Sequence, residues 1–222
     1  MDLNTVFSDS KLAILRELSK GEKSPSELSK NLKTSIANIS MQARLLEALG
    51  IIEKQKKDAS GMGKPRINYS LKKEFAYVTL LKKNQCAKKL IKLEPSDKII
   101  FSAYFLNEPK LLYFLLKFYF AFDEIILGSQ GFSFLGSKDD AIEFLILHEK
   151  KSELLHRFKD LQYSHQGNSK KIIVNVYTKE EFQKGLQEKN NGFESLISQS
   201  YILYDTDDFL FEAKSKNIYS NV

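Results

Sequence analysis

The sequence predicts an α+β chain of two domains, and three observations lead to this prediction. A chain of 222 residues, 42% of them hydrophobic, can bury one large core or two modest ones, and its length favours two. Charge is divided unevenly, because residues 1–92 hold 19 Lys and Arg against 9 Asp and Glu, whereas residues 93–222 hold 15 against 19. Residues 8–71 also show three helix patterns and a hairpin pattern, whereas residues 124–199 alternate between strands and helices.

This charge division limits the classes of partner. A module of net charge +10 attracts polyanions, most commonly nucleic acid, while the acidic remainder argues against a binding surface spread over the whole molecule.

The single cysteine, Cys86, excludes an intramolecular disulfide and a cysteine-based zinc cluster. The apolar run Leu111–Phe122 is too short to span a membrane and predicts a buried helix. Without a signal segment at its start, the chain is expected in the cytoplasm, with no membrane, cofactor or metal.

Two short helices are predicted first. Ser8 or Asp9 can cap a helix whose Leu12, Leu15 and Leu18 recur at helical spacing. The second helix begins with a capping box at Ser24–Glu27, in which the serine hydroxyl and the glutamate carboxylate each accept a backbone amide. Proline at the first helical position costs no hydrogen bond there, and two leucines, Leu28 and Leu32, form the inner face.

A third helix opens at Thr34 or Ser35 and ends before Gly50. Apolar residues spaced three and four apart predict its buried side, which is formed by Ile36, Ile39, Ala43 and Leu46. The complementary side offers short or amide-bearing side chains that can reach base edges and phosphates from a major groove. These candidate DNA-binding residues are Ser35, Asn38, Ser40, Gln42 and Arg44.

The hairpin that follows is predicted from Ile51–Lys57 and Arg66–Leu71, joined by a glycine-containing loop. It concentrates basic side chains, which would pair with phosphates and supply salt-dependent affinity with little sequence information. These further DNA-binding candidates are Lys54, Lys56, Lys57, Lys64 and Arg66.

With Leu46–Glu53 linking helix to hairpin, residues 8–71 resemble the winged helix-turn-helix of the ArsR and MarR classes of prokaryotic regulators. The resemblance implies double-stranded DNA as the partner and a homodimer on two half-sites, with its seam predicted at Phe101–Phe122. Two alternatives remain open. Winged helices also serve as protein-docking modules, and any one of these features alone would fit a solvated small domain.

A lysine-rich connector is expected at residues 72–96, between domains at 1–71 and 97–222. It is predicted to include a strand or helix packed against the hairpin of residues 51–71, which is the wing of the resembled fold. Its lysines either contact phosphates or form a solvated face. Pro95 disfavours helix in the residue before it and marks the boundary.

The C-terminal domain is predicted to be α/β. Asn107 can cap a helix over Glu108–Phe122. Strands are predicted at Glu124–Leu127, Ala141–Leu147 and Lys171–Tyr177, and helices at Lys151–Leu161, Lys179–Lys189 and Gly192–Gln199.

Residues 127–143 (LGSQGFSFLGSKDDAIE) are similar to the minimal nucleotidyltransferase fold, in which a strand ends in Gly-Ser and the next strand carries Asp-x-Asp. The resemblance covers roughly residues 123–205. It implies three carboxylates that hold two Mg²⁺ ions. This chain places Ala141, Glu143 and Asn175 at those positions, which implies a degenerate domain that is not an enzyme.

Two features of this resemblance leave other outcomes open. Gly128 and Ser129 remain candidate nucleotide-binding residues, and a different register would set Asp139 or Asp140 beside Glu143 in an active Mg²⁺-dependent nucleotidyltransferase, with the winged helix recruiting its acceptor. The preferred interpretation is a DNA-binding transcriptional regulator whose second domain serves sensing, oligomerisation or partner docking, with a small-molecule or nucleotide effector. The histidines His148, His156 and His165 are expected to be separate surface or edge residues.

Overall fold

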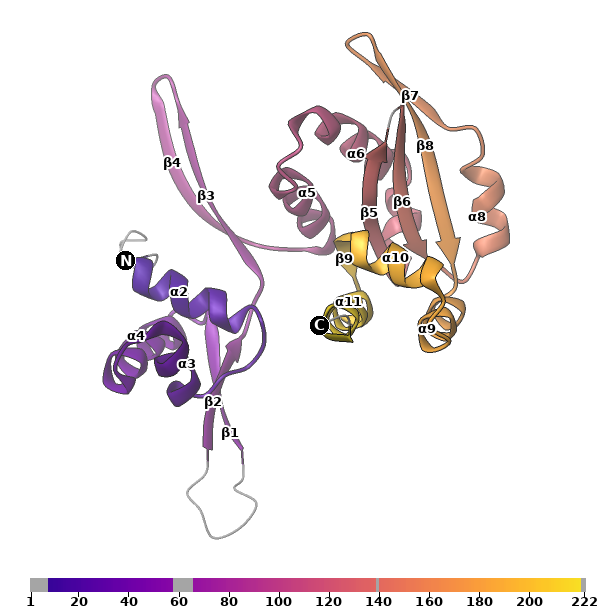
Figure 1. The fold of residues 1–222 in the computed structure, drawn as a ribbon. Helices are drawn as coiled ribbons and strands as arrows, with labels where there is room; N and C mark the ends of the chain where they lie inside the picture. Colours follow the sequence, from indigo (N-terminus) through magenta and orange to yellow (C-terminus); the bar gives the residue numbers. More distant parts are fainter. Residues whose placement is uncertain (1–7, 58–65, 139, 221–222) are drawn as a thin grey trace. The chain divides into compact units, whose positions relative to one another are not determined.

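The computed structural model describes residues 8–57, 66–138 and 140–220 (Figure 1). The chain divides into two compact units, Met1–Leu93 and Glu94–Val222. The division falls inside the segment expected as a connector, between Leu93 and Glu94 and one residue before Pro95. Each unit has hydrophobic clusters of its own, so each is described separately.

The first unit begins with three helices, α2 (Asp9–Leu18), α3 (Pro25–Leu32) and α4 (Ile36–Ala48), which confirms the predicted order. The capping box at the start of α3 is also confirmed. The Ser24 amide donates to Glu27 Oε2 at 2.7 Å, and the Glu27 amide donates to Ser24 Oγ at 3.3 Å. These bonds satisfy amides that the first helical turn would otherwise leave unpaired.

The inner faces of these helices depart from the sequence pattern at Leu12 and at Ile36, the second of which was predicted to be buried. Leu12 is 42% exposed, and Ile14 is buried in its place beside Leu15 and Leu18. Two residues correspond to about 200° around a helix, which puts Leu12 opposite Ile14. Ile36 is 52% exposed because side chains lean toward the helix N-terminus, so a first-turn residue has no preceding turn to cover.

The predicted hairpin is confirmed as antiparallel strands β1 (Ile52–Lys57) and β2 (Arg66–Leu71). Lys23 extends it by an isolated bridge, because Lys23 and Tyr69 exchange both backbone hydrogen bonds. Tyr69 itself is buried, and this burial raises the pKa of its phenol. The hairpin is therefore anchored to the helical core at its base. Its loop, with the candidate Lys64, lies outside the described residues.

The expected connector forms a second hairpin from β3 (Phe75–Lys82) and β4 (Gln85–Lys92). Phe75 packs against the helical core of the first unit. Farther along, large apolar side chains are in solvent, and Leu81 is 72% exposed. Among the described residues of this hairpin, Phe75 is the one that packs against that helical core, while the Tyr77 hydroxyl is also buried.

The second unit is a five-stranded mixed sheet in the order β7-β8-β6-β5-β9 (Figure 1). All neighbouring strands are antiparallel except β6 and β8, which are parallel. The strands are β5 (Gly131–Lys138), β6 (Ala141–Leu147), β7 (Gln162–His165), β8 (Asn168–Tyr177) and β9 (Tyr201–Asp205).

Helices cover both faces of this sheet because the side chains of β6 alternate between two clusters. Phe144 packs in one cluster with residues of α5 (Pro95–Phe105), α6 (Pro109–Ala121), α7 (Asp123–Leu127) and α8 (Lys151–Arg157). Leu145 packs in the other with residues of α9 (Lys179–Gln187), α10 (Asn191–Gln199) and α11 (Phe209–Ser220). Phe114 and Phe118 of α6 are buried, as predicted, and no described helix is both long and apolar enough to cross a membrane.

The predicted strand at Glu124–Leu127 is wrong, since this segment lies in helix α7. Periodicity cannot distinguish a short strand from a helical turn, and Asp123 and Glu124 in the first turn favour helix. The segment between the first two predicted strands, for which no strand was predicted, forms β5, and the helix predicted to Leu161 ends at Arg157 before β7. Four further elements among the described residues were not predicted, namely α5, β7, β9 and α11.

Candidate nucleic-acid interface

The turn between α3 and α4 fixes where the exposed side of α4 begins. Lys33 ends α3 in the left-handed region at a φ of 50°. The Ser29 hydroxyl donates to the Thr34 carbonyl at 2.6 Å, and the Ser35 hydroxyl accepts the Asn38 amide at 3.2 Å. Side-chain bonds thus hold both sides of the turn and cap α4, and Ser35, a predicted DNA-binding residue, is the cap.

The predicted amide side chains Asn38 and Gln42 lie along one flank of α4. Asn38 Nδ2 donates to the Thr34 hydroxyl at 3.0 Å, and Gln42 Nε2 approaches Asn38 Oδ1 at 3.5 Å. Both residues are half-buried, and Gln42 Oε1 is buried with no hydrogen-bond partner among the described residues. In the structure, these two amides therefore bond along the flank of α4, and the Gln42 oxygen is covered.

Ser40 and Arg44 lie on the other flank, at about 100° per residue around the helix. The predicted residues therefore do not share one face. The side opposite the buried Ile39 holds an apolar stripe, spaced four, four and three residues apart, which we call the α4 stripe: Ala37, Met41, Leu45 and Ala48, all exposed. Sequence reasoning missed these residues although the spacing was available, because only polar side chains were considered as ligands of DNA.

The wing adds basic groups next to α4. Lys54 and Lys56 are exposed, and both lie on the same face of β1 as Ile52. Tyr69 of β2 packs in the same hydrophobic cluster as Ala43 and Leu46, so the later turns of α4 adjoin β2. The candidates Lys57 and Arg66 are the last paired residues of the hairpin.

The candidate nucleotide-binding residues of the second unit, Gly128 and Ser129, do not end a strand. Gly128 caps the C-terminus of α7 with a φ of −83°. Ser129 is buried, and its hydroxyl donates to the Ile126 carbonyl at 2.6 Å. The strand that ends in Gly-Ser is β5, at Gly136 and Ser137.

The residues at the three presumed metal positions do not fit the two Mg²⁺ ions that the nucleotidyltransferase resemblance implies. Ala141 and Glu143 share one face of β6, but alanine has no ligand atom. Asn175 Nδ2 donates to the Phe144 carbonyl at 3.3 Å, which holds the amide against the sheet. Asp139 lies outside the described residues. The histidines are engaged separately: His148 Nδ1 accepts the Lys150 amide, and His165 stacks on Tyr113.

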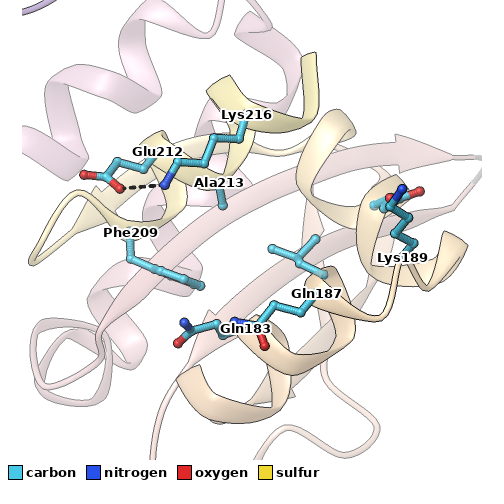
Figure 2. Close-up of a pocket in the computed structure, with 9 residues that line it drawn as sticks. Gln183, Gln187, Lys189, Phe209, Glu212, Ala213 and Lys216 are labelled. Atoms are coloured by element: carbon cyan, nitrogen blue, oxygen red, sulfur yellow. Dashed lines mark hydrogen bonds and ion pairs between the residues drawn. The ribbon is translucent and has the colours of Figure 1, made fainter. Parts of the chain in front are cut away.

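The described residues of the second unit line several cavities, two of which are as follows. One, of about 350 Å³, lies between α9, α10 and α11, and Figure 2 shows Phe209 and Ala213 facing Gln183 and Gln187 across it. At its rim, Lys216 forms an ion pair with Glu212 at 3.2 Å. A larger cavity, of about 690 Å³, lies beside the end of β5. Its lining includes Leu111, Phe114, Phe134, Ser137, Asn168 and Lys170.

Residues 8–54 match the family model described as bacterial regulatory protein, arsR family. The match covers α2, α3, α4 and the first half of β1. The chain thus carries a helix-turn-helix of the arsR kind, completed by the β1–β2 hairpin and followed by a separate sheet domain. Comparison with curated proteins gives no match.

Proposed function

We propose that this chain is a DNA-binding transcriptional regulator whose first unit binds double-stranded DNA with α4 in the major groove and the β1–β2 hairpin along the phosphates. The match of residues 8–54 to the arsR family carries the proposal. The capped α3–turn–α4 geometry supports it, because a fixed turn presents the start of α4 to a groove.

The salt dependence of DNA binding tests this function. Changing Lys54 and Lys56 to glutamine should lower affinity for all duplex sequences and reduce the slope of log affinity against log salt by about one per lysine. Lys184→Gln, at an exposed position in the second unit, is the matched control and should change neither. Binding would be measured by fluorescence anisotropy over a salt series.

Two results would contradict the proposal. No binding of duplex DNA at low salt would exclude a DNA-binding regulator. Binding that ignores the Lys54 and Lys56 substitutions would exclude the wing as a phosphate contact and favour a protein-docking module.

For the second unit we propose a non-catalytic role in sensing or oligomerisation. Ala141 and the bonded Asn175 support the loss of catalysis, and the cavities offer room for a small-molecule or nucleotide effector. The rival is a nucleotidyltransferase that uses Glu143 with Asp139 or Asp140. Incubation with labelled nucleotides, Mg²⁺ or Mn²⁺ and candidate acceptors decides between them, since incorporation that Glu143→Ala abolishes would overturn the proposal.

We also propose a homodimer, because one recognition helix alone gives modest affinity. Phe114 and Phe118, in the predicted seam, are buried within the second unit, whereas Tyr104, Phe105 and Phe120 are 60%, 78% and 61% exposed. Light scattering should therefore give twice the mass of the chain, and Phe105→Ser should lower it. A monomer at micromolar concentration would exclude this assembly.

A further inference from the structure

The α4 stripe occupies the position from which a helix-turn-helix contacts bases, yet it contains no hydrogen-bonding side chain. Met41 is 54% exposed and Leu45 is 40% exposed. Isolated exposed apolar residues need no explanation, but four at helical spacing opposite the core form a continuous surface. The neighbouring amides of Asn38 and Gln42 are already engaged along the flank, with Thr34 Oγ1 and Asn38 Oδ1 as their acceptors. The ligand of this surface must therefore itself offer apolar groups.

Its surroundings favour a polyanion as that ligand. Arg44 is exposed on one flank, Ser35 opens the helix N-terminus, and Lys54 and Lys56 lie on the adjoining wing. Basic groups around an apolar stripe complement phosphates around a groove. The major groove has one apolar group that distinguishes base pairs, the 5-methyl of thymine.

We propose that α4 selects its DNA site by contacts of Ala37 and Met41 with thymine methyl groups, and that Asn38 and Gln42 do not read bases. This inference rests on the proposed function, because it names the feature that the same helix recognises. Phosphate contacts by the wing set general affinity, and the stripe sets the preference for A·T pairs at fixed positions.

Deoxyuridine provides a direct test, since it keeps every hydrogen-bonding group of thymine and lacks only the methyl. The full chain would be used to enrich duplexes from a random pool, and the enriched duplex would be compared with its deoxyuridine copy. Each contacted methyl should contribute about fourfold in affinity, corresponding to roughly 0.8 kcal/mol per buried methylene-sized group. Two contacts would give about fifteenfold.

Variants assign the effect to the stripe. Met41→Ala should weaken binding of the thymine duplex several-fold and bring the two duplexes closer in affinity. Leu12→Ala, an exposed apolar residue of α2, is the matched control and should leave the ratio unchanged. Asn38→Ala, checked for folding by circular dichroism, should keep the same preferred sequence.

The outcomes separate the inference from the function on which it rests. Equal binding of the thymine and deoxyuridine duplexes, or enrichment of no sequence, would overturn methyl recognition while salt-dependent binding still supports a DNA-binding regulator. Unchanged DNA affinity in Met41→Ala would also overturn it and assign the stripe to a protein partner. Absence of any DNA binding would contradict both the methyl recognition and the proposed DNA-binding function.

Discussion

Asp205, the last residue of β9, has a half-buried carboxylate whose charged form is disfavoured by its surroundings. Burial raises its pKa to about 6, although the amides of Phe211 and Leu210 donate to it and oppose the shift. Because the folded pKa lies above the ordinary value of 3.8, the folded chain holds a proton that the unfolded chain has released between these pH values. The stability of the second unit should therefore fall as pH rises from about 4 to about 6.

Asp205→Asn should remove this loss, because asparagine keeps an oxygen acceptor for the Phe211 amide and carries no charge. The variant should be more stable at pH 7 by about 1–2 kcal/mol, less than the roughly 3 kcal/mol of the whole shift, because solvent screens a half-buried group. Urea unfolding from pH 4 to 7 measures this. Asp207→Asn is the control. Lys179 lowers the pKa of Asp207, so removing the Asp207 carboxylate should not stabilise the second unit at pH 7. Parallel pH curves for wild type and Asp205→Asn would contradict the argument.

Position 185 requires glycine because of side-chain packing and not because of its backbone conformation. A Cβ there would lie 2.3 Å from the Phe193 ring, so α9 and α10 approach too closely for a side chain. Gly185→Ala should destabilise the second unit by about 1–3 kcal/mol, even though alanine favours helix over glycine. Thermal unfolding measures the change, and Phe193→Leu in the same chain should recover part of it. A more stable Gly185→Ala would mean that the two helices can separate freely.

Elements whose signals are local could be predicted from the sequence, and elements made by distant partners could not. The capping box of α3 and the α4 cap lie within four residues, β6 is a mostly apolar run, and the predicted half of β8 begins its own apolar run at Ile172. In contrast, β9 is a strand because β5, some seventy residues earlier, pairs with it. The site divides in the same way. The basic wing was predictable, but the bond that engages the Asn38 amide with the Thr34 hydroxyl was not.

The β3–β4 hairpin should be dispensable for folding. No described residue from 77 to 92 belongs to a hydrophobic cluster, and isolated two-stranded hairpins are only marginally stable. Replacing residues 77–90 by Asn-Gly keeps the Ala76–Ile91 pair and closes a two-residue turn. Circular dichroism should show unchanged melting of the remaining chain.

The same deletion decides between the two roles left open for the hairpin lysines. If Lys82, Lys83, Lys88 and Lys89 form a solvated face, the salt dependence of DNA binding should be unchanged. A shallower slope would show that they contact phosphates.

The whole molecule should behave as two independently folding units. The helical cluster of residues 14–69 and the two clusters around the sheet share no residue, and the division falls at Leu93. Domains with separate cores generally fold alone. Fragments 1–93 and 94–222 should each unfold cooperatively, and calorimetry of the full chain should give two transitions that match them.

DNA binding then distinguishes what each unit contributes. Fragment 1–93 should keep the base preference and the deoxyuridine effect of the full chain, because α4 and the wing are intact. Its affinity for a two-half-site duplex should fall if residues 94–222 join two copies, since binding of the second half-site then loses its high local concentration. Linking two copies of fragment 1–93 by a flexible chain should restore the affinity for the two-half-site duplex. Equal affinity of fragment and full chain would contradict dimerisation through the sheet domain and would leave sensing as its proposed role.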